Sequence, residues 1–400
     1  MNNIRFSVTP QNDLETSSGI VVFRVSFSEP VSDSGVLKVD VVGSGKAEFR
    51  WVSEKVIGVH THLLDVGHHC IRFSLIDEEK VVVSAEETIF LEERMGLYNV
   101  VRASLIEHGT PLVFEGPCDS SYYPYHDGSV LPWFDRPDAD SHIQDLLTIG
   151  QISNEEAHYL RDFVQKGFVV MENMIDNDLI DAVNDEIDDA VAKGYQGYKQ
   201  GSSQRLEHMH NQYPNMRKLW LDKRHTRIVD LIFAVRGRPC QTLTSVFGSQ
   251  LKVHSDLIHL TPFPAGYMCG TWIALQDVSE NSGELVIYPE SHRDRRIYLR
   301  DTGCSKVNDD WAELEAKVPS IMADIAAHYE PFVYRPKKGA VVIWHENLLH
   351  AGSIRLDQSL ERRSVAIHSF AEGVIAYYDT SGLVAHVTSL SEIEQTAEVE

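Results

Sequence analysis

Apolar and polar residues alternate along much of the first 95 residues of the chain. The alternation is clearest in residues 19–30, 36–43, 70–79 and 80–93. Because the side chains of a β-strand point alternately to its two faces, each of these segments is predicted to be a strand with one buried face. Short clusters of Ser, Gly and Pro separate the segments, as turns between strands do. The pattern predicts an accessory β-sandwich over residues 1–95.

Four histidines lie in this region, His60, His62, His68 and His69. No carboxylate or cysteine stands beside them at a matching spacing, so ordinary strand and turn histidines are favoured over adventitious metal binding. Residues 67–77 read G-x-H-x-x-x-F-x-L-x-D, which is similar to the late strands of an immunoglobulin-like domain. The resemblance implies that the predicted sandwich is immunoglobulin-like.

Residues 96–148 show neither a strand period nor a helix period. They mix Pro, Gly, Asp and Ser with aromatic residues, which predicts a connector. The aromatic residues indicate that this connector lies against other parts of the protein. Two interpretations stay open, a packed strap between two domains and a lid over the later domain.

The period of the apolar positions changes near residue 149. Ser153 and Glu156 have the spacing of a capping box, which predicts a helix that ends at Gly167. Asp176 or Asn177 is expected to begin a second helix with a regular apolar stripe. From Thr242 onward short strands dominate. Helices followed by many strands predict an α+β domain over residues 149–388, built on a β-sandwich or barrel, before a loose acidic tail at 389–400.

Composition narrows the functional classes. The 400 residues contain 36 Lys+Arg and 59 Asp+Glu, a net charge of −23, which disfavours nucleic acid and anionic membranes as partners. No apolar run approaches the roughly 20 residues of a membrane span, and the first residues do not resemble a secretory signal. Five scattered cysteines without a C-x-x-C pair fit a reducing cytosol. We therefore expect a cytoplasmic protein.

Three groups of residues in the strand-rich region carry candidate chemistry. The first is His254 with Asp256, which would share one face of a strand, and the second is His350. Two histidines and one carboxylate are the ligand set of non-haem Fe(II) oxygenases, and they leave three positions open for a keto acid and O2. The third group contains Arg362 and Ser364, which alternate onto one face and suit a carboxylate. A lone H-x-D arises often by chance, whereas the three groups together predict an oxygenase site.

The stretch from Gly270 to Arg293, GTWIALQDVSENSGELVIYPESHR, resembles the phytanoyl-CoA dioxygenase family of Fe(II)/2-oxoglutarate oxygenases. The segment YLRDFVQKGFVVMENMID, near the start of the second predicted domain, is also similar to that family. The resemblance therefore spans roughly residues 150–375. It implies a mainly β fold with flanking helices, in which the catalytic domain is a double-stranded β-helix (a cupin-like jelly roll). It also implies Fe(II) and 2-oxoglutarate as cofactors and O2 as co-substrate.

The resemblance assigns roles position by position. His254, Asp256 and His350 become the catalytic iron ligands, Arg362 holds 2-oxoglutarate, Trp272 lines the site and Ser364 assists. The chain departs from the family pattern at three places. Glu290 stands where the family usually has glycine, and Gly352 stands where some members have a hydroxyl, with Ser353 one place later. One extra residue follows His350, which leaves Arg363 as an alternative anchor.

Further polar residues are candidates for substrate contact. His208 and His210 precede the first ligand segment, His259 and Tyr267 follow it, and Arg293 begins a basic run in an acidic protein. A solvated surface is the competing interpretation for each of them. His345 lies an odd number of residues before His350, so on a strand it would point away from the site.

We therefore expect an Fe(II)/2-oxoglutarate-dependent dioxygenase of hydroxylase type. Its substrate would be a small polar metabolite or natural-product intermediate, with succinate and CO2 released, because a −23 chain is a poor general receptor for an acyl-CoA. A catalytically idle binding protein of the same fold and a metal-dependent hydrolase using the same His/Asp/His set are the alternatives. Small molecules are the expected partners, nucleic acid and membrane are not, and a homodimer stays open.

Overall fold

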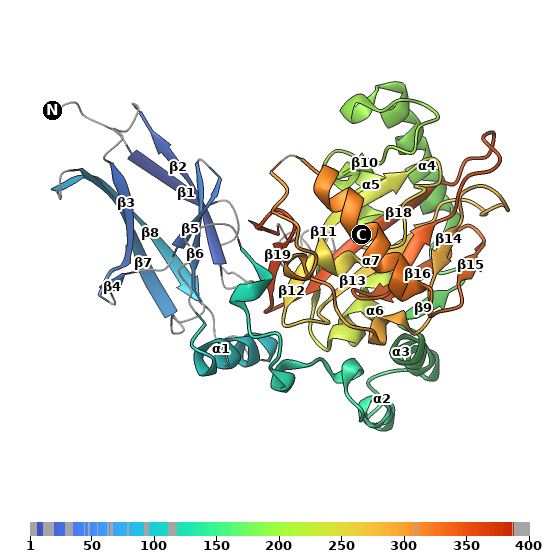
Figure 1. Cartoon of the computed structure of the whole chain (residues 1–400), viewed down its shortest axis with the longest axis horizontal. Helices are drawn as coiled ribbons and strands as arrows, with labels where there is room; N and C mark the ends of the chain where they lie inside the picture. The colour runs from blue at the N-terminus through green and yellow to red at the C-terminus, as the bar shows by residue number, and fades with distance from the viewer. Residues whose placement is uncertain are drawn as a thin grey trace. The chain divides into compact units, whose positions relative to one another are not determined.

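The computed structural model shows two compact units, which are described separately (Figure 1). Unit 1 comprises residues 1–130 with 372–384, and unit 2 comprises residues 131–371 with 385–400. The structure describes residues 6–10, 20–28, 35–43, 45–46, 49–53, 55–61, 64, 67–77, 80–91, 96–110, 118–308, 310–385 and 387. His62 and the predicted acidic tail 389–400 lie outside these residues. In the described part, no helix is both long and apolar enough to cross a membrane.

Unit 1 contains two four-stranded antiparallel sheets. The first has the order β1 (Phe6–Pro10), β2 (Ile20–Phe27), β6 (Val56–His60), β5 (Phe49–Ser53). The second has the order β4 (Gly45–Lys46), β3 (Val36–Val41), β7 (Gly67–Asp77), β8 (Lys80–Leu91). One core joins them: the ring of Phe23 on β2 packs edge-on against that of Phe73 on β7, with centroids 4.9 Å apart. Whether this pair of sheets is immunoglobulin-like stays a prediction.

Three of the four histidines that the sequence places in residues 1–95 occupy strands. His60 ends β6, and His68 and His69 stand at the start of β7. The ring of His68 packs against that of Phe90 on β8, with centroids 4.7 Å apart.

The region predicted as an irregular connector contains two helices, α1 (Leu97–Glu107) and α2 (Ala139–Thr148), so that expectation is wrong in part. In α1 the residues Leu97, Val101 and Leu105 are buried, a four-residue spacing that Gly and Pro elsewhere in the segment obscured. Three 3-10 turns follow α1, η1 (Ser120–Tyr122), η2 (Gly128–Val130) and η3 (Trp133–Asp135).

Trp133 and Phe134 of the connector pack within unit 2. The indole Nε1 of Trp133 donates to Ile232 O at 2.7 Å, and the ring of Phe134 lies edge-on to that of Phe163 at 5.4 Å. These contacts lie within unit 2 alone, so the strap and the lid both stay predictions.

The helix predicted after Ser153 is present as α3 (Asn154–Lys166). Both hydrogen bonds of the capping box form, from Glu156 N to Ser153 Oγ at 3.1 Å and from Ser153 N to Glu156 Oε2 at 2.7 Å. Gly167 ends the helix in the left-handed conformation, as predicted. The other helices of unit 2 are α4 (Asn177–Ala192), α5 (Pro214–Trp220), α6 (Lys223–Phe233) and α7 (Ala312–Ala326).

Two antiparallel sheets face each other in unit 2. The larger has the order β10 (Leu206–Glu207), β11 (Gly237–Ser245), β18 (Ser364–Ala371), β13 (Met268–Ala274), β16 (Val341–His345), β9 (Phe168–Met171). The smaller has the order β15 (Phe332–Tyr334), β14 (Leu285–Ile287), β17 (His350–Gly352). Their inner faces share one apolar cluster, which includes Trp272 and Trp344 from the larger sheet and Ile287 from the smaller. The mainly β fold with flanking helices is confirmed.

Glu290 precedes the 3-10 turn η7 (Ser291–Arg293). Glu290, where the family has glycine, adopts the left-handed conformation with φ 70°. Its N–H donates to Lys166 O at 2.8 Å. The substitution therefore leaves the turn in place and adds the steric cost of a side chain in that conformation, about 1–2 kcal/mol.

Glu284 ties three segments of unit 2 together. Its buried carboxylate accepts hydrogen bonds from Ser353 Oγ at 2.6 Å, Asn281 N at 3.1 Å and Arg335 Nε at 3.0 Å. Burial by itself would raise the pKa of Glu284, but these donors outweigh it and lower the pKa to about 2. The ionised carboxylate therefore stabilises the fold.

We expect Glu284→Gln to lower the free energy of unfolding at pH 7 by about 2–3 kcal/mol. Since the folded pKa is depressed, the wild-type contribution is present above pH ~4.5 and is lost as the pH falls toward 2. Urea unfolding at a series of pH values measures both effects. Glu280→Gln is the control, because the side chain of Glu280 is 72% exposed. Equal acid sensitivity of wild type and the Glu284 variant would contradict the assignment.

Candidate metal centre

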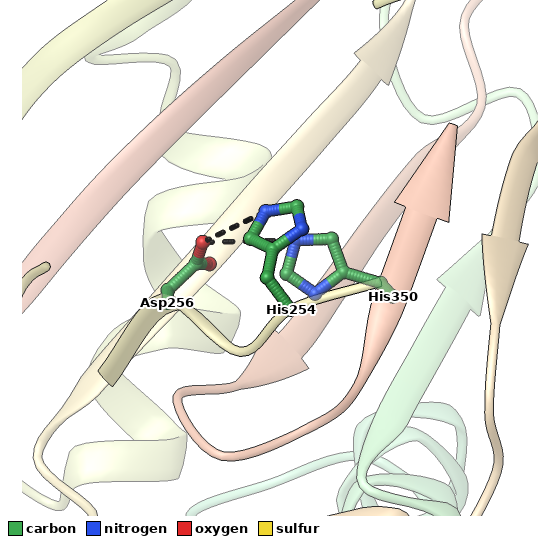
Figure 2. Close-up of side chains that lie close together, drawn as sticks. All are labelled: His254, Asp256 and His350. Carbon is green, nitrogen blue, oxygen red and sulfur yellow. Dashed lines mark ion pairs between the residues drawn. The ribbon is translucent and has the colours of Figure 1, made fainter. Parts of the chain in front are cut away.

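Three side chains of unit 2 converge, His254, Asp256 and His350. Their potential ligand atoms all lie within 4.8 Å of one another. Asp256 Oδ1 is 3.9 Å from His254 Nε2 and 3.6 Å from His350 Nε2. Figure 2 shows the carboxylate facing the two imidazoles across a small gap. Within the described residues, this is the one such group of three.

Backbone contacts explain how residues almost one hundred positions apart meet. His254 and His350 exchange two backbone hydrogen bonds, of 3.0 and 2.9 Å, in an isolated antiparallel bridge. Asp256 begins a 3-10 turn, η6 (Asp256–Ile258). The two side chains do come together, but the expectation that His254 and Asp256 share a strand face is wrong. The turn after the bridge, and not a strand period, brings the carboxylate to the two rings.

Both imidazoles have the same tautomer imposed on them. His254 Nδ1 lies 2.7 Å from Lys252 O, and His350 Nδ1 lies 3.0 Å from Leu348 O. A carbonyl only accepts, so each Nδ1–H donates, and in a neutral ring the Nε2 lone pair is then the one that faces the gap. Nε2 is thus available as a metal ligand on both rings.

The charges of the group suit a divalent cation. Burial, together with the neighbouring His350, lowers the pKa of His254 to about 3, so this ring is neutral. Burial would raise the pKa of Asp256, but the histidines around it hold that pKa well below its usual value. A carboxylate and two imidazole nitrogens around a buried gap are ligands that suit a divalent metal cation.

The second carboxylate oxygen of Asp256 is held by two residues that the sequence analysis did not identify. Trp344 Nε1 donates to Oδ2 at 2.7 Å, and His368 Nε2 lies 3.3 Å from the same oxygen. The sequence does contain a pattern that could have identified His368. Residues 362, 364, 366 and 368 alternate onto one face of β18 and the residues before it, and Arg362 and Ser364 were already candidates.

Arg362 is buried with little to neutralise its charge. It is 3% exposed, its Nη1 donates to Ser364 Oγ at 3.1 Å, and its guanidinium lies 5.6 Å from the ring of Trp272. In the described part of the chain its Nε has no hydrogen-bond partner, and the one charged group that acts on it electrostatically is Glu284, which opposes the effect of burial on its pKa. Burial lowers the pKa of Arg362 to about 10. A buried cation with an unused donor fits an anionic ligand.

Arg363, the alternative anchor, is already paired. Its guanidinium contacts Asp188 at 2.7 Å and Glu361 at 2.8 Å. As its neighbour in the chain, Arg362 alternates to the opposite side and contacts Ser364 and Trp272. The structure therefore favours Arg362 as the residue that receives an anion in the site.

The remaining candidate residues are dispersed. His210 is buried, stacks on Trp220 with centroids 3.8 Å apart and contacts Thr242 Oγ1 at 3.0 Å. His208 begins the 3-10 turn η5 (Met209–Asn211), with its ring 5.8 Å from that of His210. His259 follows η6, three residues after Asp256, with its ring 5.9 Å from that of Trp311. Of these, only His259 adjoins the metal group along the chain, and substrate contact stays a prediction for each.

Three other residues belong to packing or to other networks. Tyr267 is buried between the rings of Phe134 and Phe233. Arg293 is exposed and donates to Val164 O at 3.2 Å. His345 faces Asp135 Oδ1 at 3.4 Å and is outside the metal group, in agreement with its odd spacing from His350.

A pocket of about 530 Å³ opens beside the ligand segments. Six of its seven lining residues are polar: Gln196, Ser203, Gln204, Arg205, Glu207 and Ser249, with Leu251 the seventh. Leu251 O accepts a hydrogen bond from Gly352 N at 2.9 Å, so the pocket wall is joined to the strand that begins at His350. The sequence analysis did not identify these residues.

Comparison with known proteins places this region in a family. Residues 163–358 match the family model described as Phytanoyl-CoA dioxygenase (PhyH). No curated protein sequence matches the chain. Similar solved structures include the non-heme alpha ketoglutarate dependent carbocyclase SnoK from nogalamycin biosynthesis, with 18% identity and a TM-score of 0.46 over 58% of this chain and 88% of that one.

Two further structures have comparable scores. EctD from S. alaskensis, with 2-oxoglutarate and 5-hydroxyectoine, has 15% identity and a TM-score of 0.46 over 60% of this chain and 85% of that one. AviO1 from Streptomyces viridochromogenes Tue57 has 15% identity and a TM-score of 0.41 over 55% of this chain and 96% of that one. Likenesses at this level do not extend to substrate or reaction.

Proposed function

Residues 163–358 form a domain of the phytanoyl-CoA dioxygenase family, and from that membership we propose that the chain is an Fe(II)- and 2-oxoglutarate-dependent dioxygenase that hydroxylates a C–H bond. One observation carries the proposal. His254, His350 and the ionised Asp256 present three ligand atoms to one gap. The same unit also buries Arg362, whose Nε has no hydrogen-bond partner among the described residues.

The metal would be held by His254 Nε2, His350 Nε2 and Asp256 Oδ1. Three protein ligands would leave further positions on the metal for a keto acid and O2. When bound, iron and 2-oxoglutarate supply the oxidising power, with O2 consumed and succinate and CO2 released. The protein's own part is to hold the ligands in place and to exclude water from a buried gap.

The distal carboxylate of 2-oxoglutarate would be bound by Arg362 and Ser364. The unpaired Nε and the Nη atoms of Arg362 offer the planar donor fork that a carboxylate accepts from. Ser364 Oγ, which accepts from Nη1 at 3.1 Å, can direct its own proton to the same ligand. Trp272 covers this guanidinium and forms a wall of the site.

Asp256 bears on the type of reaction. Enzymes of this class that transfer a halogen typically have a small residue at this position, which leaves room for a halide. A carboxylate with two donors on its outer oxygen occupies that room. We therefore propose hydroxylation as the outcome.

The substrate we propose is a small polar metabolite or natural-product intermediate. The pocket beside the ligand segments is lined by hydroxyl and amide groups, with Arg205 and Glu207 adding one charge of each sign. Such a lining suits hydrogen-bonded, polar molecules better than an acyl chain. The net charge of −23 also disfavours a polyphosphate carrier.

Succinate formation tests the proposal. Under air with Fe(II), the purified full-length chain should convert 2-oxoglutarate to succinate, slowly by itself and faster with a substrate from a library of polar metabolites. A catalytically idle binding protein would form no succinate under any of these conditions. A metal-dependent hydrolase would turn over in the absence of O2, so an anaerobic arm separates it from an oxygenase.

A further inference from the structure

Four residues form a row across the larger sheet of unit 2. Gly270 on β13 lies directly opposite Trp344 on β16, and on its other side directly opposite His368 on β18. His368 is in turn opposite Gln241 on β11. Directly opposed residues in antiparallel strands point to the same face. The row therefore runs perpendicular to the strands on the face that is turned toward Asp256.

Trp344 and His368, the two residues of the row on either side of Gly270, meet at one oxygen atom of Asp256. Trp344 Nε1 donates to Asp256 Oδ2 at 2.7 Å, and His368 Nε2 lies 3.3 Å from the same atom. Gln241 Nε2 lies 3.0 Å from His368 Nδ1. An amide N–H can only donate, so Nδ1 accepts and the proton of His368 lies on Nε2, directed to Asp256. The side chains of Asp256, Trp344, His368 and Gln241 are all at least partly buried.

Gly270 provides the space that the row needs. A Cβ atom at this position would lie 2.4 Å from Cε2 and 2.5 Å from Nε1 of Trp344. Heavy atoms do not approach that closely, so any side chain here would displace the indole. The glycine is required by the close approach of Trp344 rather than by its own backbone conformation. It allows the indole to lie across β13 and to reach Asp256.

We propose that Trp344, His368 and Gln241, seated by Gly270, form a carboxylate clamp that orients Asp256 and sets the affinity of the metal centre. The clamp occupies Oδ2 with two donors, which leaves Oδ1 as the single oxygen turned toward the two Nε2 atoms. Asp256 is thereby held as a monodentate ligand. The inference rests on the proposed metal site and adds its positioning residues. Partners of this kind around a metal centre typically change metal affinity or activity 10–100-fold.

Co(II) binding to the full-length chain under argon tests the clamp. His368→Leu removes the donor and should weaken Co(II) binding by about 10–100-fold, whereas His368→Gln keeps an N–H near the position of Nε2 and should stay within about threefold of wild type. Trp344→Phe and Gly270→Ala should weaken binding in the same direction. The visible d–d absorption of Co(II) should also change with His368→Leu, because a released carboxylate can bind through both oxygens.

Matched controls separate positioning from general stability. His225 is a buried histidine of α6 whose Nε2 contacts Leu219 O at 2.8 Å, so His225→Leu imposes a similar loss away from the metal group. Gly128 has no atom within 4 Å of an added Cβ, so Gly128→Ala controls for Gly270→Ala. Both controls should bind Co(II) as wild type does. Gln241→Leu, at a half-buried position, is the milder variant if His368→Leu does not fold, and it should weaken binding in the same direction.

Two results would overturn the clamp. In the first, His368→Leu or Gln241→Leu folds and binds Co(II) with wild-type affinity and spectrum. In the second, the control variants lose as much Co(II) affinity as the clamp variants. Failure of the proposed function looks different. If only the proposed function is wrong, wild type binds Co(II) and the clamp variants lose Co(II) affinity, but no succinate forms with Fe(II). A wild-type chain that takes up no Co(II) would overturn both.

Discussion

Replacing Asp256 with asparagine is expected to abolish 2-oxoglutarate turnover and to weaken metal binding by more than about 100-fold, the upper end of the range for residues that only support a ligand. The side chain keeps its shape in this variant but loses the charge. Asp256 is the one carboxylate of the group, and its other two members are histidines. Without it, a divalent cation would lie in a buried gap with no compensating negative charge. Co(II) titration and succinate formation measure the two effects.

Asp277→Asn is the matched control. That carboxylate is 58% exposed and pairs with Lys337 at 2.7 Å, so its loss should leave both metal binding and turnover unchanged. His254→Ala and His350→Ala should resemble the Asp256 variant. Wild-type turnover in any of these three ligand variants would show that the site has been assigned to the wrong residues.

Arg362→Leu is expected to raise the KM for 2-oxoglutarate by about 150-fold, which corresponds to about 3 kcal/mol for a buried ion pair that loses one partner. The unbound protein should not lose stability. Burial lowers the pKa of Arg362 to about 10, which means that folding disfavours its charged form at pH 7. Leucine removes that cost. Thermal unfolding of the metal-free chain, beside 2-oxoglutarate kinetics, therefore separates a ligand-binding arginine from a structural one.

Arg363→Leu should give the opposite pattern. It breaks the pairs with Asp188 and Glu361 near the surface, so stability should fall by about 0–1 kcal/mol while the KM for 2-oxoglutarate stays within about twofold. A large rise in KM for this variant, with Arg362→Leu unaffected, would exchange the roles of the two arginines.

Local patterns in the sequence were sufficient where the structure itself is local. The capping box at Ser153 and Glu156 and the glycine at the end of α3 depend on neighbours within a few positions, and both formed as predicted. The connector shows the reverse case. Its helix α1 buries Leu97, Val101 and Leu105, but turn-forming residues later in the segment masked this short period.

The candidate site shows the same division. Residue types and the resemblance to the family identified His254, Asp256, His350 and Arg362, because this chemistry admits few side chains. A shared strand face does not pair His254 with Asp256, since Asp256 begins a 3-10 turn. No local pattern could reveal the backbone bridge between His254 and His350, whose partners lie far apart in sequence.

What the sequence by itself determined is the inventory: a mainly β chain, its capped helices, an acidic surface, and a set of donors that can bind iron and a keto acid. The tertiary structure decided which atoms face each other. Strand register placed Gly270 between Trp344 and His368, and so brought two donors to one oxygen of Asp256. Alternation at the start of β18 turned Arg362 inward and left Arg363 to its surface ion pairs. These choices depend on hydrogen-bond register between distant strands, which is a property of the assembled sheet and not of any segment within it.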